Sequence, residues 1–393
     1  MTIKKIIALL LCIILLSITI SGCNSSDNDL PDDNGDIYNE DDGTPGIPDN
    51  DHSHGFINFE AALSTFPADT VMLRSGDFII TWAELYYFLF NVTTSLLYSY
   101  GGPLEWSEPF DLNQTLAEIV LEYSTEEALA FLSYRYGLHS NNFQMSDDDL
   151  KDFNSDIEEL IAMSESREAF EESLREGGGF YNFDLFFELN KINMSVGLLI
   201  SDLFGEDADL LPDEDVESFA EENGFMMAMH ILIKLEDGDF DDPLGEAENI
   251  LAELNAQAGT DDFAEFFHEL MHEVSEDLGG LMSYPDGYLF VHKDMVLEFS
   301  DTTAGLEIGE LSGIVETSYG YHIILRIPLD YEAVPFELYR EGIYRSLRQL
   351  AALDSIYSML DSWRDSLDVS FSPEYNSIDL ASIFKWVDED CDH

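Results

Sequence analysis

The spacing of the hydrophobic residues changes twice along this chain, and those changes limit the folds available to it. In the stretches 115–136, 147–176 and 183–204, apolar side chains recur every three or four positions, as on the buried face of an amphipathic helix. The stretch 225–235 is instead almost continuously apolar, which is typical of a buried strand. Helical spacing returns after Pro335. The pattern predicts an α+β protein in which a helical domain is interrupted by a compact insert of strands and helices.

Local signals place the first elements of the helical part. Two short apolar runs around Gly76 predict a tight β-hairpin over residues 71–80. Thr81 and Glu84 then form a capping-box pattern that opens an aromatic helix. Helices are expected over 82–90, 115–136, 147–176, 183–204, 212–224 and 336–363.

The N-terminus predicts export. Two lysines precede an apolar run over residues 6–20, which is shorter than the roughly 20 residues of a membrane span and fits the apolar region of a secretory signal. The run ends at Ser21-Gly22-Cys23, which resembles the lipobox of bacterial lipoproteins. That resemblance implies a lipid on the Cys23 sulfur and an anchor on the extracytoplasmic face of the cell membrane. An ordinary secretory signal with an incidental Cys is the alternative.

Cysteine content and charge exclude several classes of protein. Besides Cys23, the chain has Cys12 inside the expected signal and Cys391 near its end, so we expect no intrachain disulfide and no cysteine zinc site after processing. With 16 Lys and Arg against 81 Asp and Glu, the formal net charge is −65. This charge argues against a nucleic-acid partner, because such proteins place basic side chains against phosphates. Residues 24–54 hold ten acidic residues and no Lys or Arg, which predicts an extended tether.

Six short blocks in the insert resemble, in order, the parvulin (rotamase) family of peptidyl-prolyl isomerases. The blocks are Met229–Lys234, Phe267–Asp277, Pro285–Phe290, Met295–Phe299, Gly309–Gly313 and Tyr319–Ile324. A series of ordered blocks is far more specific than a single short motif. The hairpin and capped helix over 71–90 also resemble the start of the chaperone domain in exported foldases of the PrsA and SurA type.

The resemblance implies an extracytoplasmic foldase. Such a protein catalyses the isomerisation of X-Pro bonds in unfolded or newly secreted polypeptides, uses no cofactor or metal, and shields the apolar segments of its clients. For the insert, the resemblance implies a small antiparallel sheet flanked by helices, and a homodimer is one form that such a chain can take. The alternative is a non-enzymatic holdase chaperone that uses the parvulin fold only as a binding module.

We divide the chain accordingly into six parts. These are a lipoprotein signal peptide (1–22), a disordered acidic tether (23–55), an N-terminal helical chaperone region (56–222), the parvulin domain (223–330), a C-terminal helix that packs on the N-terminal region (331–368) and a tail (369–393).

The expected reaction breaks no bond. Rotation about a peptide bond meets a barrier of about 18–20 kcal/mol because the twisted amide loses its resonance. A catalyst must therefore bind the twisted amide better than the planar one. An apolar hollow that removes the carbonyl group from water, with a few fixed polar groups, can do this. By resemblance, Met295, Phe299 and Phe290 form that hollow, and we expect Met295 and Phe299 one helical turn apart on the same face.

Four polar residues are expected beneath the hollow. By resemblance, His230 and His322 lie on paired central strands, Asp277 follows a helix as the family's acidic site residue, and Thr317 supplies a hydroxyl near the second imidazole. We expect the four to form one hydrogen-bond network that sets the tautomers of the imidazoles and the field at the carbonyl. The alternative is that both His are core residues that only hold the strands together.

The loop after the first strand of the insert, residues 236–243, is acidic. Phospho-specific members of the resembled family carry basic residues in this loop. Because an acidic loop repels a phosphate, we expect no preference for phospho-Ser/Thr-Pro sequences.

Two metal-binding patterns also occur, and we expect neither to hold a metal. Residues 268–272 satisfy the HExxH pattern of zinc proteases, with His292 on offer as a third ligand, but the segment runs directly into the family's Ser-x-Asp turn. Residues 237–248 place carboxylates at positions 1, 3, 5 and 12 of a calcium loop. Its sixth position is Asp242, where the sharp turn of such a loop needs Gly.

Overall fold

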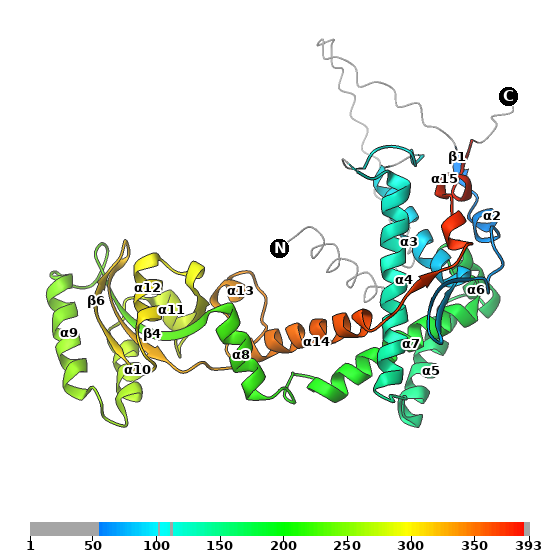
Figure 1. Cartoon of the computed structure of the whole chain (residues 1–393). Helices are drawn as coiled ribbons and strands as arrows, with labels where there is room; N and C mark the ends of the chain where they lie inside the picture. Colours follow the sequence, from blue (N-terminus) through cyan, green and yellow to red (C-terminus); the bar gives the residue numbers. More distant parts are fainter. Residues whose placement is uncertain (1–54, 101–102, 111–112, 389–393) are drawn as a thin grey trace, which may run out of the picture. The chain divides into compact units, whose positions relative to one another are not determined.

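The computed structural model describes residues 55–100, 103–110 and 113–388 (Figure 1). The expected signal, Cys23, nearly all of the tether and Cys391 lie outside these ranges. Helices predominate, and the strands form one four-stranded, one three-stranded and one two-stranded sheet within the described residues. The fold is therefore α+β, as the hydrophobic spacing predicts. Among the helices in these ranges, none is both long and apolar enough to span a bilayer.

A hairpin opens the helical part, as its sequence predicts. β2 (Val71–Ser75) and β3 (Phe78–Thr81) pair antiparallel around Gly76, whose φ of 56° is the left-handed conformation that the turn requires. Thr81 N–H donates to Glu84 Oε2 at 2.7 Å, and Glu84 N–H donates to Thr81 Oγ1 at 3.4 Å. This capping box starts α3. The helices of this part are α2 (Phe59–Leu63), α3 (Trp82–Tyr100), α4 (Leu116–Ser140), α5 (Asp147–Ala162), α6 (Arg167–Glu176), α7 (Phe183–Phe204) and α8 (Asp213–Asn223).

The stretch 147–176, predicted as one helix, is two helices, α5 and α6. The break occurs because Ser166 caps a new helix, its side chain accepting a hydrogen bond from Ala169 N–H. The apolar spacing continues across the break, so spacing alone could not reveal it.

The stretch 336–363, also predicted as one helix, divides into α13 (Phe336–Arg340) and α14 (Leu347–Asp365). Between the two helices, Gly342 has a φ of 76°, which ends helical geometry. Ser346 then forms a capping box that opens α14. The break places α13 where it can contact the sheet described next, instead of continuing the line of α14.

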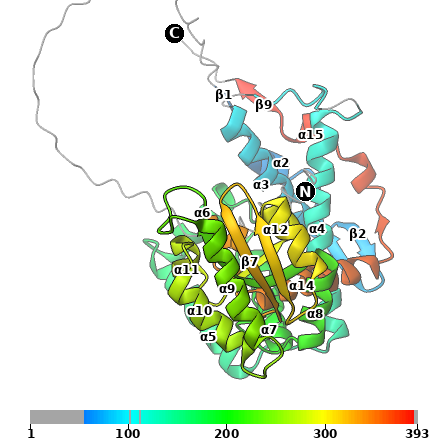
Figure 2. The same cartoon turned by 90° about the vertical axis from the view of Figure 1, so that its left-hand side faces the viewer.

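The second compact part spans residues 225–327, and we call it the sheet unit. α8 ends at Gly224, whose φ of 72° turns the chain into the first strand. All strands pair antiparallel in the order β5-β4-β7-β6, so β4 and β7 are the central neighbours. Figure 2 shows β7 between α9 and α12, both of which contact it. Its elements are β4 (Phe225–Lys234), α9 (Pro243–Gln257), α10 (Phe263–Val274), α11 (Leu278–Ser283), β5 (Tyr288–Val291), the 3-10 turn η1 (His292–Asp294), α12 (Leu297–Gly305), β6 (Leu311–Glu316) and β7 (Gly320–Ile327).

Side chains of β4 alternate between two covered faces of this sheet, because successive residues of a strand point to opposite sides. Met229, Ile231 and Ile233 pack against α9 and α10 on one face. On the other face, Ala228 packs with Phe299 of α12. Both faces are buried, which explains why the sequence of β4 is continuously apolar and does not alternate with polar residues.

The chain returns to the helical part after the sheet unit. α14 packs along α4, where Trp363 lies so close to Gly137 that a Cβ atom at this glycine would collide with the indole ring. Arg364 forms an ion pair with Glu126 of α4. The first turns of α14 join α8 and one end of β4 in a single apolar cluster.

The residues after 368, expected as a short strand or a loose tail, form several small elements. They are β8 (Ser370–Phe371), the 3-10 turn η2 (Tyr375–Ser377), α15 (Leu380–Ile383) and β9 (Trp386–Asp388), of which β8 pairs with β2 and β9 pairs with β1 (Gly55–Ile57). Phe384 is fully buried, and the indole N–H of Trp106 donates to its carbonyl at 3.3 Å. The tail therefore belongs to the core of the helical part.

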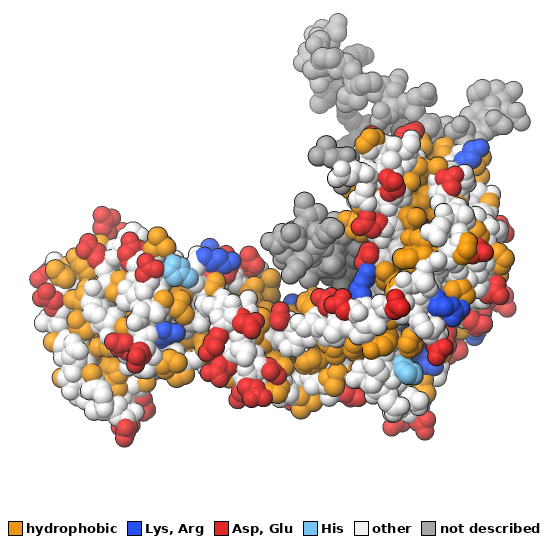
Figure 3. All heavy atoms as spheres, in the orientation of Figure 1, with side chains coloured by type: hydrophobic (Ala, Val, Ile, Leu, Met, Phe, Trp, Pro, Cys, Tyr) orange, Lys and Arg blue, Asp and Glu red, His pale blue; other side chains and the backbone are white. Residues whose placement is uncertain are grey.

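Acidic side chains are spread over the face of the molecule that Figure 3 shows, whereas Lys and Arg are few there. The surface therefore carries the charge imbalance of the sequence. A strongly charged surface of one sign favours solubility and repels polyanions.

Candidate active site

The strand register brings the two expected imidazoles together. In the antiparallel pairing of β4 with β7, His230 lies opposite Ile324 and Leu232 lies opposite His322. His230 and His322 are therefore diagonal neighbours on the same face of the sheet. Their ring centroids are 5.2 Å apart, and both side chains are more than nine-tenths buried.

Asp277 reaches the first imidazole from the start of α11. It is the N-cap of that helix, where its Oδ1 accepts a hydrogen bond from Gly280 N–H at 3.0 Å. Its Oδ2 accepts a hydrogen bond from the Tyr288 hydroxyl at 2.7 Å and lies 3.3 Å from His230 Nε2. Burial alone would raise the pKa of Asp277, but the hydrogen bonds from His230, Tyr288 and Gly280 hold it well below its usual value. Asp277 is therefore a carboxylate at neutral pH.

Thr317 reaches the second imidazole from the turn between β6 and β7. Its hydroxyl oxygen lies 2.9 Å from His322 Nε2 and accepts a hydrogen bond from Tyr319 N–H at 3.1 Å. Burial, together with the neighbouring His230, lowers the pKa of His322 to about 3. Because His322 is then neutral at physiological pH, its Nε2 can accept a hydrogen bond from the Thr317 hydroxyl.

The hydrogen bonds divide the expected network into two pairs. One pair joins Asp277 with His230, and the other joins Thr317 with His322. The imidazoles touch through their rings, while Nδ1 of each is buried and has no hydrogen-bond partner among the described residues. Among the described residues, no hydrogen bond therefore links the two pairs into the single continuous network expected from the sequence.

A cavity of about 420 Å³ opens over His230, Asp277 and His322, whereas Thr317 contacts His322 without lining the cavity itself. Met295 and Phe299 line it as the sequence suggests, but Met295 is not in a helix. Its backbone is extended, with φ −117° and ψ 167°, and α12 begins two residues later at Leu297. The expected spacing of one helical turn is therefore wrong, and the two side chains meet because the chain bends between them.

Phe290 lies behind the cavity and does not line it. Its side chain is fully buried, and its ring centroid is 5.6 Å from that of Phe299. Phe290 therefore supports Phe299 from the core side of the sheet.

Several cavity residues escape the sequence reasoning. Tyr288 binds Asp277, and burial and then that hydrogen bond raise its pKa far above the usual value, so its hydroxyl keeps its proton. The other additional lining residues are Leu232, Asp294, Val296, Tyr319, Phe336 and Arg340. Strand alternation could have assigned Leu232 to the face of His230. Phe336 and Arg340 come from α13, beyond the sheet unit, and no local pattern marks them.

The arrangement can hold a proline ring against apolar side chains while it removes the adjacent carbonyl from water. The polar groups at its base have fixed charges and orientations: an ionised Asp277, a protonated Tyr288 hydroxyl and a neutral His322. Fixed dipoles of this kind favour one charge distribution of a bound group over another without having to reorganise. The site therefore suits stabilisation of a conformer more than bond cleavage.

The HExxH segment is used for local contacts. His268 Nε2 lies 3.2 Å from Asp286 Oδ1, and His272 Nε2 lies 2.9 Å from the carbonyl oxygen of Pro285. His292 is the third zinc ligand that the sequence pattern would use, and its Nε2 lies 2.7 Å from Asp301 Oδ1. Across the described ranges, no group of three or more His, Cys, Asp or Glu is placed to hold a metal ion.

The acidic loop after β4 is organised by a buried carboxylate. Glu276 accepts hydrogen bonds from the backbone N–H groups of Lys234 and Asp239, at 2.7 Å for Lys234. Asp242 caps α9 by accepting a hydrogen bond from Gly245 N–H at 3.2 Å. The loop residues of the calcium pattern therefore serve turn and cap roles.

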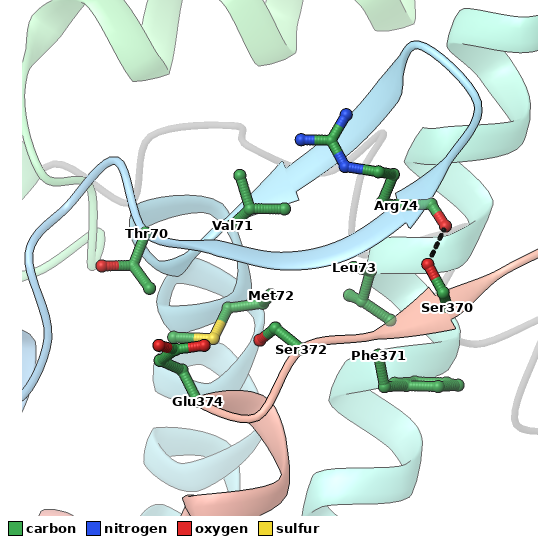
Figure 4. A pocket seen from close by; sticks show the side chains of 9 residues that line it. All are labelled: Thr70, Val71, Met72, Leu73, Arg74, Ser370, Phe371, Ser372 and Glu374. Carbon is green, nitrogen blue, oxygen red and sulfur yellow. Dashed lines mark hydrogen bonds between the residues drawn. The ribbon is translucent and has the colours of Figure 1, made fainter.

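A separate cavity of about 370 Å³ lies in the helical part between β2 and β8 (Figure 4). Figure 4 shows Arg74 beside Ser370, whose hydroxyl donates to the carbonyl of Arg74 at 3.1 Å. Its charged lining residues are Arg74 and Glu374. Among the described residues, the paired imidazoles belong to the cavity of the sheet unit, which is therefore the candidate active site.

Comparison with known proteins agrees with this geometry. The family model described as "Rotamase: PPIC-type PPIASE domain" matches residues 230–327. The foldase protein PrsA of Clostridium botulinum (strain Loch Maree) is 25% identical over 287 residues, which is 70% of this chain and 79% of that protein. The foldase protein PrsA of Halalkalibacterium halodurans is 36% identical over 119 residues, covering 29% of this chain and 31% of that protein.

Among solved structures, the chain is similar to the peptidylprolyl isomerase PrsA from Bacillus cereus. It is 21% identical in sequence, the alignment covers 72% of this chain and all of that one, and the TM-score is 0.30. The alignment to PrsA of Clostridium botulinum strain Langeland spans 44% of that protein. The matched family segment contains both imidazoles and Asp277, and the longer alignment extends into the flanking helical part. Residues 230–327 thus carry a PPIC-type peptidyl-prolyl isomerase domain of the parvulin kind, and the chain is similar to PrsA foldases.

Proposed function

We propose that the chain is an extracytoplasmic foldase that isomerises X-Pro bonds in newly exported polypeptides. One observation carries the proposal. Asp277, His230 and His322 line a largely apolar cavity, with Asp277 3.3 Å from His230, and Thr317 lies 2.9 Å from His322 beside it. Asp277 has a fixed negative charge and His322 is neutral, so these two groups set their part of the field at a bound carbonyl before the substrate arrives.

In this proposal, the proline ring lies against Met295 and Phe299, and the preceding carbonyl lies over the imidazoles. A planar amide has separated charges that water stabilises, so removal of water raises its energy relative to the twisted form. The cavity thereby lowers the barrier without forming a covalent bond. Asp277 acts as a positioning residue, because its hydrogen bonds fix the His230 ring and the Tyr288 hydroxyl.

We further propose that the helical part holds client segments, with boundaries near 56–222 and 331–368 and the tail from 369. Exposed apolar side chains support this role, among them Met194 and Leu203 on α7 and Tyr357 on α14. The lipobox-like sequence supports an anchor at Cys23, with the acidic tether 23–55 between membrane and fold. A homodimer belongs to this proposal as a form that would enclose a client between two copies.

The alternative is a holdase without isomerase activity, and Asp277→Asn separates the two. Peptide X-Pro isomerisation and suppression of aggregation of an unfolded client are measured on the same protein. The proposal expects Asp277→Asn to lose at least roughly ten-fold in isomerisation rate, since removing one preorganised electrostatic partner commonly costs this much or more. Suppression of aggregation should remain.

The matched control is Asp261→Asn, which makes the same change at an exposed turn outside the site. It should leave both readouts unchanged. A wild-type protein that suppresses aggregation but never accelerates X-Pro isomerisation would establish the holdase instead.

A further inference from the structure

The outer wall of the active-site cavity comes from α13, a helix outside the matched family segment. Phe336 and Arg340 of this helix line the cavity together with the residues of the sheet unit. α13 is fixed there by aromatic contacts and by a hydrogen bond. The Tyr284 hydroxyl donates to the Phe336 carbonyl at 3.2 Å, and the Phe336 ring centroid is 5.4 Å from that of Tyr288. A second contact joins Tyr339 to Tyr284 at 5.1 Å.

This helix places a positive charge in the cavity lining of a strongly acidic protein. Among the described residues that line the cavity, Arg340 alone is a Lys or Arg. The two cavity carboxylates are engaged elsewhere: Asp277 by Tyr288 and His230, and Asp294 by the backbone N–H of Val291 at 3.0 Å. Neither carboxylate forms an ion pair with Arg340.

The partner of Arg340 is exposed and exchangeable. Its Nη1 lies 3.1 Å from Glu337 Oε2, and the two side chains are 60% and 44% exposed. Its guanidinium carbon lies 5.5 Å from the centroid of the Phe336 ring, which holds the side chain near the mouth of the cavity. An exposed ion pair of this kind contributes little to stability, so a carboxylate from another chain can replace Glu337.

We propose that α13 is part of the substrate site and that Arg340 makes the isomerase selective for client segments with a carboxylate beside the proline. The proposal rests on the isomerase function proposed above and adds its substrate class. The carboxylate belongs to Asp or Glu within two residues of the proline. Arg340 is then a specificity-determining residue that the family segment itself does not contain.

A guanidinium can pair with a carboxylate or with a phosphate, so the number and neighbours of the basic residues decide between the two. Phosphate recognition in proteins uses clusters of Arg, whereas Arg340 already shares its charge with Glu337. The acidic loop 236–243 is held near Asp277, because the backbone N–H of Asp239 donates a hydrogen bond to the neighbouring Glu276. The selectivity therefore concerns acidic side chains and remains compatible with the absence of a phosphate preference.

The test uses the protein from residue 24 onward and pairs of proline peptides that differ only by Glu or Gln. Glu or Gln is placed at each of the two positions before and the two positions after the proline. For every pair, kcat/KM for isomerisation and Kd for binding are measured at low and at high salt. The proteins are wild type, Arg340→Gln and the matched control Arg345→Gln, whose arginine is exposed on the same segment and lies outside the described cavity lining.

We expect wild type to prefer Glu over Gln by about two- to five-fold at one or more of these positions, the range of an exposed ion pair. The preference should weaken at high salt, because both charges are near solvent. It should vanish in Arg340→Gln and persist in Arg345→Gln. Unchanged unfolding midpoints for both variants exclude a folding defect as the cause.

Equal Glu-to-Gln ratios in wild type and Arg340→Gln at all four positions would overturn the inference. The two readouts keep this failure separate from failure of the isomerase function. Peptides that turn over without any dependence on Arg340 contradict the inference alone. A different result is possible, in which peptides bind with a preference that depends on Arg340 but are never isomerised. That result contradicts the isomerase function and establishes the selectivity of the site.

Discussion

His322 should make the stability of the sheet unit depend on pH, and His322→Gln should remove that dependence. Burial and the neighbouring His230 lower the pKa of this imidazole from 6.5 to about 3. The unfolded chain therefore binds a proton below pH 6.5, whereas the folded protein does not bind one until pH 3. His322 therefore makes its full contribution to the free energy of unfolding above pH 6.5, and this contribution falls as the pH drops toward 3.

The magnitude follows from the linkage relation. Each pH unit between these two values costs about 1.4 kcal/mol, so the drop from pH 6 to pH 4 should cost about 2–3 kcal/mol. The 81 Asp and Glu also titrate in this range, so the informative quantity is the difference between wild type and His322→Gln at each pH. That difference should shrink by the stated amount between pH 6 and pH 4.

Urea unfolding can be followed through the methyl NMR signals of Met226, Met227 and Met229 in β4. These report on the sheet unit itself, which matters because a protein with several compact parts need not unfold in one step. His292→Gln is the matched control, since its imidazole is 49% exposed and pairs with Asp301 on the surface. A difference between wild type and His322→Gln that stays constant from pH 6 to pH 4 would refute the buried, neutral His322.

Three further predictions concern the backbone, the substrate and the anchor. Gly320→Ala should destabilise the sheet unit by roughly 3 kcal/mol or more, because φ is 155° and a Cβ would collide with the Ile233 carbonyl. Gly313 has open space around it, so the control Gly313→Ala should change the free energy of unfolding by less than about 1 kcal/mol. A phospho-Ser-Pro peptide should be isomerised no faster than its unmodified twin, and faster turnover would show that the acidic loop 236–243 does not govern selection. Cys23→Ser should abolish incorporation of labelled fatty acid in cells, and retained label would locate the lipid elsewhere.

The positions of the two imidazoles could be predicted from the sequence. β4 is one uninterrupted run, and strand alternation with the ordered family-like blocks sets which residues face the same side. The hairpin at Gly76 and the capping box of Thr81 and Glu84 were likewise readable, because both depend only on neighbours in sequence. The fold class followed from the change of spacing near residue 225.

The remaining features depend on contacts that sequence spacing does not encode. The four polar residues form two separate pairs because of how their side chains are oriented. His230 turns Nε2 toward Asp277, which leaves its Nδ1 without a partner in the described part of the chain. Met295 lines the cavity from extended backbone, which a helical spacing argument could not anticipate. Phe336 and Arg340 reach the site only because Gly342 and Ser346 break the C-terminal helix.

The central claim is that the cavity over His230 and His322 lowers the barrier to rotation of a prolyl bond. The most direct measurement is the cis–trans exchange rate of an Ala-Ala-Pro-Phe peptide by exchange NMR, with the protein at a small fraction of the peptide concentration. The account predicts an exchange rate that rises with protein concentration, saturates with peptide and collapses in Asp277→Asn. A peptide that binds at the cavity while its exchange rate stays at the uncatalysed value would contradict the claim.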